Sequence, residues 1–403
     1  MTSSQFRYFA AALAWAAIVH TTLAGDGQFT VDNGVTDGDA IAQAVSSERG
    51  IQKAAEDTKA PRSLSVGAQV YGLAFSPDGH LLATAGKNGV RLWTLASGKQ
   101  AVPLIEGIIP RPKKIPFWGT PSARSPVFSL DGRLVAAAEY LPCEEGVRDV
   151  AAGRYRVWDV ASGKLRAKRD FPDPLTTLAF SPDGARLAIG DACNGFGFGE
   201  IAGQTIWYQH GESRMAPPTA DVAFSPDGAM LAVADDPDEA RKYLSGGLHV
   251  PAQGEDCTIR LIDATTKKTL HEISAKSSEG LHKLAFAADG KTLYAAYEDG
   301  HLRQWNVLSA KLVTSYRIQT EPWYFTPIAF SSDGNWLAVR DRRDGPIVIW
   351  DLAVAQKAAT IDVSTDSSDI LTISFAARLL AVADPDDKEG SVSLWKVAER
   401  PLE

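Results

Sequence analysis

The chain has few of the residues that build metal sites, disulfide frameworks and common catalytic centres. Its 403 residues include three cysteines and seven histidines, and no histidine lies in a His-x-Glu-x-x-His or related spacing. No Gly-x-Ser-x-Gly nucleophile turn is present, and the Gly-rich stretch 195–199 lacks the strand-to-helix setting of a phosphate loop. We therefore expect no catalytic residues, no metal ion and no cofactor.

Long hydrophobic runs are also scarce. The apolar run at 8–19 has 12 residues, whereas a bilayer span needs about 20. Arg7 precedes it and Thr22-Leu23-Ala24 follows it, which is the layout of a secretory signal peptide. We expect cleavage after Ala24, with an uncleaved anchor as the alternative. No cysteine lies near the junction, so a lipid anchor is not indicated. The sequence thus predicts an exported, periplasmic or extracellular protein with no membrane span in the mature chain.

Positive charge is in deficit. Lysine and arginine number 41 against 49 aspartates and glutamates, which gives a formal net charge of -8. Nucleic acids and anionic membranes select basic surfaces. The charge balance therefore argues against a nucleic-acid partner.

What the sequence does contain is a recurring phrase: a short apolar strand that ends in Phe, then Ser-Pro-Asp-Gly or a variant, then another apolar strand. Successive copies of the Phe are 53, 52, 44, 62, 44 and 45 positions apart. Such a period indicates a repeat architecture. The copies begin at Phe75, Phe128, Phe180, Phe224, Phe286 and Phe330, with an eroded seventh at Phe375.

Each repeat can be divided into four antiparallel strands. In the sixth, strands are expected at 326–330, 336–339, 346–351 and 357–361, with a tight turn at 331–334. Asp-Gly between apolar runs is a strong hairpin signal, because Gly tolerates positive φ. The third strands are predicted at 90–93, 155–159, 205–207, 258–263, 302–306, 347–351 and 392–395.

The third strands that end in Trp-Asp, together with the Phe-Ser-Pro-Asp-Gly turns, resemble the WD-repeat β-propellers over residues 62–403. Examples are Trp158-Asp159 and Trp350-Asp351. The resemblance implies an all-β, seven-bladed propeller of four-stranded antiparallel blades. The Gly-His dipeptide that precedes the first strand in that family is missing, which indicates a divergent, bacterial-type member. The predicted signal peptide makes it an exported one.

The two ends of the repeat region are expected to close the ring. Six residues follow the last third strand near Val397, too few for a fourth strand. Residues 62–66 should supply that strand and leave no open sheet edge. Residues 25–61 fit no blade and are predicted to be a linker, in which the Ala-rich stretch 37–59 could form a short helix.

The two faces of such a ring should differ. Turns between strands one and two, and between strands three and four, lie together on what we call the plain face, and they are minimal in this sequence. We call the opposite face the elaborated face, because it should carry every long connection. These connections are predicted at 106–124, 139–153, 191–203, 235–256 and 319–327.

Two tryptophans without a role in the repeats fall in those connections. Trp118 follows Phe117 and the basic residues Lys113 and Lys114, while Trp323 precedes Tyr324 and Phe325. Exposed aromatic residues beside cations are typical of protein interfaces. These seven residues form the predicted partner-binding site, with loops that fold back over the channel as the alternative.

Cysteines and acidic residues mark the same connections. A disulfide between Cys143 and Cys193 would close about 50 residues and contribute roughly 4 kcal/mol, with Cys193 and Cys257 as the competing pair. The acidic groups near Asp235 and Asp384 do not follow the spacing of a calcium loop.

These features predict a non-enzymatic, monomeric propeller that acts as a protein–protein interaction or assembly scaffold in the cell envelope. Its protein or peptide partner should bind the face with the long loops. The alternative is a small-molecule-binding, hydrolytic or oxidoreductive propeller enzyme with its site at the channel mouth.

Overall fold

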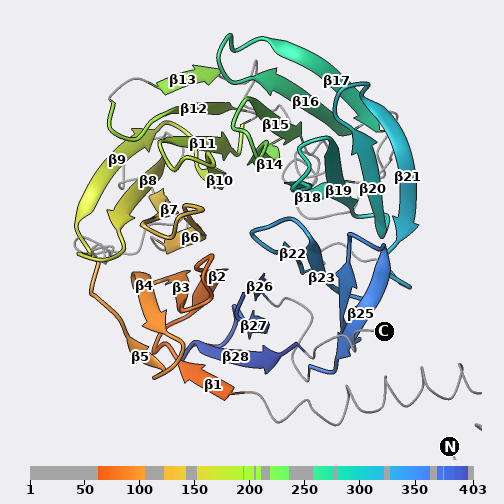
Figure 1. Cartoon of the computed structure of the whole chain (residues 1–403). Coiled ribbons are helices and arrows are strands. Elements are labelled where there is room, and N and C mark those ends of the chain that lie inside the picture. The colour runs from red at the N-terminus through yellow and green to blue at the C-terminus, as the bar shows by residue number, and fades with distance from the viewer. Residues whose placement is uncertain are drawn as a thin grey trace, which may run out of the picture. The chain divides into compact units, whose positions relative to one another are not determined.

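The computed structural model describes residues 62–104, 122–141, 152–193, 195–203, 206–209, 218–235, 257–275, 280–321, 327–363, 370–374 and 376–397. Within them, 28 strands form seven four-stranded antiparallel sheets. The sheets stand around a ring as blades, with the first strand of each blade nearest the centre (Figure 1). The predicted all-β, seven-bladed propeller is confirmed. Among these residues no helix is long and apolar enough to cross a membrane.

The blades follow one another along the chain. Blade 1 contains β2 (Val70–Phe75), β3 (Leu81–Gly86), β4 (Gly89–Thr94) and β5 (Lys99–Gln100). Blade 2 contains β6 (Ser122–Phe128), β7 (Leu134–Leu141), β8 (Ala152–Asp159) and β9 (Leu165–Phe171). Blade 3 contains β10 (Leu175–Phe180), β11 (Arg186–Asp191), β12 (Phe196–Glu200) and β13 (Ile206–Gln209). Blade 4 contains β14 (Thr219–Phe224), β15 (Met230–Asp235), β16 (Cys257–Asp263) and β17 (Thr269–Ala275).

The remaining blades keep the same order. Blade 5 contains β18 (Leu281–Phe286), β19 (Thr292–Tyr297), β20 (His301–Asn306) and β21 (Lys311–Arg317). Blade 6 contains β22 (Ile328–Phe330), β23 (Trp336–Arg340), β24 (Ile347–Asp351) and β25 (Gln356–Ile361). Blade 7 contains β26 (Ile370–Ser374), β27 (Leu379–Ala383), β28 (Ser391–Lys396) and, from the other end of the repeat region, β1 (Arg62–Ser65).

Ring closure is as predicted. Strand β1 pairs antiparallel with β28, with Leu64 opposite Val392. The Arg62 guanidinium then donates a hydrogen bond of 2.6 Å to the Leu95 carbonyl oxygen of blade 1. The closing strand therefore ties blade 7 to blade 1. The predicted linker 25–61 lies outside the described residues.

The hydrophobic core lies between neighbouring blades. One buried cluster joins Leu82 and Trp93 of blade 1 to Ala381 and Leu394 of blade 7. Because each sheet has a blade on either side, its middle strands are buried on both faces, and β7 runs through five consecutive buried residues.

Blade 3 departs from the predicted division. Residues 205–207 were expected to form its third strand, but Ile206 and Trp207 belong to β13, the fourth strand, and β12 is the third. The predicted long connection 191–203 is wrong for the same reason, since it contains the whole of β12. In it, Asp191 and Gly195 already face each other across a turn, where the Asp191 amide donates to the Gly195 carbonyl at 2.8 Å.

The physical reason for this departure is the glycine alternation in β12. Glycine has low strand propensity, so the stretch does not look like a strand in the sequence. A Cβ on Gly197 would collide with the Trp207 carbonyl oxygen, so glycine lets β13 pack closely. Phe196 and Phe198 supply the apolar surface, and their ring centroids lie 5.7 and 5.3 Å from that of Trp207.

Candidate functional site

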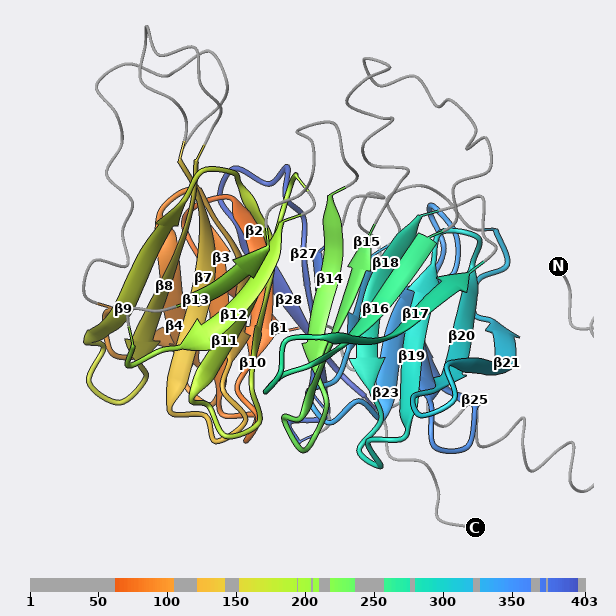
Figure 2. The ribbon, with the colours of Figure 1, turned by 90° about the horizontal axis from the view of Figure 1, so that it is seen from above.

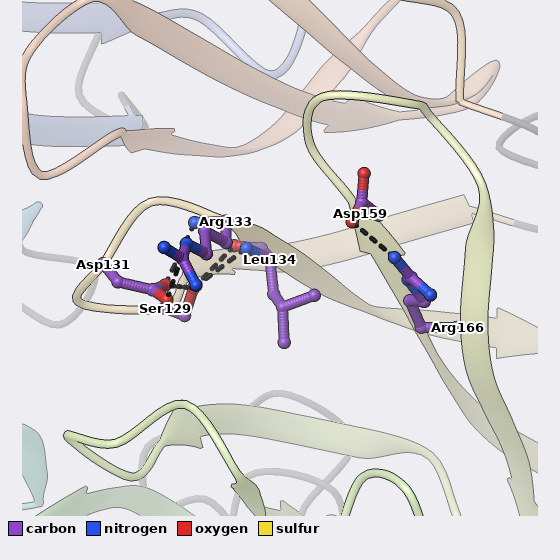
Figure 3. Close-up of polar contacts among 6 residues, drawn as sticks. All are labelled: Ser129, Asp131, Arg133, Leu134, Asp159 and Arg166. Atoms are coloured by element: carbon purple, nitrogen blue, oxygen red, sulfur yellow. Dashed lines mark hydrogen bonds and ion pairs between the residues drawn. The ribbon is translucent and has the colours of Figure 1, made fainter.

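The turns between first and second strands use their polar groups internally. In blade 2 the Ser129 hydroxyl donates to Asp131 Oδ1 at 2.7 Å and accepts from the Leu134 amide at 2.9 Å (Figure 3). The Arg133 amide donates to the same carboxylate at 3.0 Å. Gly132, with φ of 70°, completes the turn. The same pair of serine bonds recurs at Ser76, Ser181, Ser225 and Ser331.

The turn between the third and fourth strands of blade 2 behaves alike. Asp159 accepts from the Ser162 amide at 2.8 Å. It also accepts from the Arg166 guanidinium at 2.7 Å (Figure 3). The hydrogen bonds from Arg166 and Ser162 hold the pKa of Asp159 well below its usual range. In Figure 2 the tight hairpin turns gather at the lower face of the ring, which is the plain face. Its recurring Ser and Asp residues are therefore scaffold.

A second repeated feature lies at the opposite, elaborated face. Five second strands have an acid at or within two residues of their end, four residues after a buried aliphatic side chain. They are Glu139, Asp191, Asp235, Asp341 and Asp384.

In blades 2 and 4 this acid is held by an arginine of the third strand. Arg156 Nη1 donates to Glu139 Oε1 at 2.7 Å, and Arg260 Nη2 donates to Asp235 Oδ1 at 2.7 Å. Burial raises the pKa of Glu139 to about 7 and that of Asp235 to about 6, although the arginines lower both. Predicted insertions follow these two acids, and the parts of them at 142–151 and 236–256 lie outside the described residues.

In blade 3 the acid organises a turn. The fully buried Asp191 Oδ1 accepts from the amides of Cys193 and Gly195, each at 2.8 Å. The Tyr208 hydroxyl donates to Asp191 Oδ2, and burial, together with this bond, raises the pKa of Tyr208. The Cys193 sulfur lies 3.4 Å from Asp173 Oδ1.

An exposed arginine stands beside two tyrosines on the same face. Arg124, in β6, lies with its Cζ 5.5 Å from the ring centroid of Tyr71 in β2 and 5.9 Å from that of Tyr140 in β7. Both rings are half-buried, and Arg124 is exposed. Strand pairing places Arg124 opposite Ala138, at the end of the blade where β6 begins and β7 ends. This trio, which we call the Arg124 group, is the strongest candidate for a binding surface.

Polar contacts link the innermost strands next to this group. The Ser125 hydroxyl donates to the Thr176 carbonyl at 3.0 Å, and the Thr177 hydroxyl donates to Asp221 Oδ1 at 2.7 Å. These hydrogen bonds join blades 2, 3 and 4 around the centre of the ring. They hold the inner strands next to the Arg124 group in place.

None of the seven residues predicted to bind a partner can be placed. Lys113, Lys114, Phe117, Trp118, Trp323, Tyr324 and Phe325 all lie outside the described residues. So does Cys143 of the predicted disulfide, while Cys257 is buried at the start of β16. Over the part of the chain that the structure describes, no three His, Cys, Asp or Glu side chains gather to hold a metal ion.

Sequence reasoning missed both the pairing of strand-end acids with arginines and the Arg124 group. For the acids a signal was available, because arginine recurs two residues before the core residue of the third strand. In the two blades where an arginine holds the acid, it stands at Arg156 and Arg260. For the Arg124 group there was none, since its three residues come from two blades and are far apart in the chain.

Comparison with known proteins agrees with the fold. The family model "WD domain, G-beta repeat" matches residues 62–94 and 267–306. The β-propeller domain of Cps50 (Swd1) from Myceliophteria thermophila superposes with a TM-score of 0.62 at 15% identity, over 85% of this chain and 100% of that one.

Two curated relatives match over shorter stretches. Protein SLOW WALKER 1 of Arabidopsis thaliana is 31% identical over 132 residues, which are 33% of this chain and 21% of that protein. Target of rapamycin complex subunit wat1 of Schizosaccharomyces pombe is 26% identical over 148 residues, 37% of this chain and 45% of that protein. The chain thus matches less than half the length of either relative. Two segments of the chain thus match the WD-repeat family model, within a fold of seven four-stranded blades.

Proposed function

We propose that this protein is a non-enzymatic scaffold that recognises a protein or peptide partner through its elaborated face. The observation that carries the proposal is the contrast between the two faces of blade 2. On the plain face, Ser129, Asp131 and Asp159 are engaged within their own turns. On the elaborated face, Arg124 stands exposed beside Tyr71 and Tyr140, and Arg and Tyr are enriched at the energetic centres of protein interfaces.

The comparisons support this proposal in outline. The fission yeast relative is named as a subunit of a complex, and a blade ring offers a broad, rigid surface for such assembly. Among the described residues, nothing favours the alternative of a small-molecule or enzymatic site. The two carboxylates whose pKa is raised into the neutral range, Glu139 and Asp235, are each engaged by an arginine.

The proposal includes export to the cell envelope, on the grounds of the predicted signal peptide at 1–24. Fractionation of cells and N-terminal sequencing of the mature protein test it. A mature chain that starts near residue 25 in the envelope fraction supports export. An intact N-terminus in the cytosolic fraction contradicts it.

Affinity capture with matched variants tests the binding face. Wild type, Tyr71→Ala/Tyr140→Ala and Trp118→Ala/Trp323→Ala would be compared with the plain-face control Arg133→Ala/Arg166→Ala by quantitative mass spectrometry. A partner that is lost with either elaborated-face variant and kept by the control supports the proposal. Loss with the plain-face control alone would assign binding to the other face.

A further inference from the structure

We propose that Arg124 binds the carboxylate of an acidic side chain in the partner, presented on an extended peptide segment. This inference rests on the proposed function of the elaborated face and names the chemistry that the face recognises. Three observations lead to it: the state of the guanidinium, the backbone that holds it, and the charge around it.

The guanidinium of Arg124 is available to a ligand. It is exposed, and the described residues offer it neither a hydrogen-bond acceptor nor an ion-pair partner, only the rings of Tyr71 and Tyr140. Arg156 and Arg260, by contrast, each bind a carboxylate of their own blade. A guanidinium that contacts aromatic rings keeps in-plane N–H donors whose spacing matches the two oxygens of a carboxylate.

The backbone around Arg124 is held in an unusual conformation. Strand β6 has a bulge between Arg124 and Val127, and Ser125 adopts a φ of 46°, in the left-handed region that glycine favours. Strain of this kind persists where the surroundings impose it and is concentrated at functional sites.

Neighbouring blades impose this conformation from both sides. From blade 3, the Thr176 carbonyl accepts the Ser125 hydroxyl at 3.0 Å. From blade 1, Gly72 lies so close that a Cβ there would collide with the Pro126 ring. The backbone that carries Arg124 is therefore held in place before any ligand arrives, which lowers the entropic cost of binding.

The charges select a single carboxylate. The Arg124 group contains one cation, and the chain carries a net charge of -8, which disfavours a polyanion such as nucleic acid. The nearby Glu139 is occupied by Arg156 and does not neutralise Arg124. The two tyrosine rings offer apolar surface to the aliphatic part of an Asp or Glu side chain.

Peptide selection tests the proposal directly. A random-sequence peptide library is selected on immobilised full-length wild-type protein, and the affinities of enriched peptides are measured with Arg124→Ala, Arg124→Lys and the plain-face control Arg133→Ala. We expect enriched peptides to share an Asp or Glu. Arg124→Ala should weaken them about 10- to 100-fold, as expected for a hydrogen bond to a charged group, and Arg124→Lys less. Arg133→Ala should leave affinity unchanged.

Changing the shared acid to its amide completes a double-mutant cycle. The amide peptide should bind wild type as weakly as the acid peptide binds Arg124→Ala, and combining both changes should cause no further loss. Thermal melting of each variant confirms that it is folded, and Arg124→Lys retains the charge if Arg124→Ala is unstable.

Two results would overturn the inference: enrichment of no acidic peptide, or additive effects in the cycle. If enriched peptides lack acids and lose their binding in Tyr71→Ala/Tyr140→Ala, the role of Arg124 is refuted, but the proposed function of the elaborated face is not. Peptides lost only with Arg133→Ala would refute the proposed function as well.

Discussion

Lys283 Nζ in β18 lies 3.3 Å from Asp221 Oδ1 in β14, and this pair joins the inner strands of blades 4 and 5. Asp221 is 5% exposed and also accepts from the Thr177 hydroxyl of blade 3 at 2.7 Å and from the Leu284 amide of blade 5 at 2.9 Å. One buried carboxylate of blade 4 thus accepts from donors in the blades on either side of it. The contacts of blade 4 with blades 3 and 5 depend on this carboxylate.

We expect Asp221→Ala to lower the free energy of unfolding by about 3 kcal/mol, because it leaves the Leu284 amide and the Thr177 hydroxyl without their acceptor. Asp221→Asn keeps an oxygen acceptor and should cost about half as much. Chemical denaturation of the two variants checks this. Equal stability of wild type and Asp221→Ala would show that these blade contacts do not need the carboxylate.

Glu139→Gln should flatten the dependence of stability on pH. Burial raises the pKa of Glu139 from 4.5 to about 7, so between these values the folded protein holds a proton that the unfolded chain releases. Stability is therefore greatest below pH 4.5 and falls as pH rises towards 7, by up to about 3 kcal/mol. Asp235, with its pKa raised to about 6, adds a similar slope at lower pH.

The loss of slope in Glu139→Gln should be largest midway between the unfolded value of 4.5 and the folded value of about 7, at roughly pH 5.5 to 6. Denaturation midpoints measured from pH 4.5 to 7, with the exposed Glu321→Gln as control, provide the measurement. An unchanged slope in Glu139→Gln would mean that Arg156 keeps this carboxylate ionised.

Gly197→Ala should destabilise the protein by about 3 kcal/mol or more, because the new methyl group would meet the Trp207 carbonyl and separate β12 from β13. Gly132→Ala is the matched control. A Cβ there would make only an ordinary contact of 3.9 Å with Pro77, so only the positive φ is strained, at a cost of about 1 kcal/mol. If thermal unfolding ranks the two variants the other way, the division of blade 3 is incorrect.

Ser225→Ala should cost about 1 kcal/mol and make the turn more tolerant of acid. The hydrogen bond from Ser225 lowers the pKa of Asp227. This stabilisation is present above the unfolded pKa and is lost as pH falls through the lower folded value. NMR titration should show the pKa of Asp227 rising in Ser225→Ala. A titration curve that does not move would contradict the role of the hydroxyl.

Turn chemistry explains why so much of the fold could be predicted from the sequence. A Ser-x-Asp-Gly turn is built from its own residues, as at Ser129 and Asp131, so its signal is local and survives in the sequence. Closure by residues 62–66 followed from counting strands, and β1 forms there. In blade 3, glycine at alternate positions of β12 concealed the strand, because the packing against Trp207 that requires glycine comes from the next strand.

The candidate site was predictable only in part. The contrast between the two faces followed from the lengths of the connections. The Arg124 group did not, because Tyr71, Arg124 and Tyr140 meet through the packing of blade 1 against blade 2 and the bulge at Ser125.

Pairing of β1 with β28 also sets an order in time. Arg62 and Leu394 face each other in the closing sheet. During translation, Arg62 is among the first residues of the ring to be synthesised and Leu394 is among the last. The first strand to leave the ribosome is therefore among the last to find its partner, and until then blade 7 has an open edge. That interval is when a neighbouring chain could supply the missing strand, so ring closure is the step at which this protein is most exposed to misassembly.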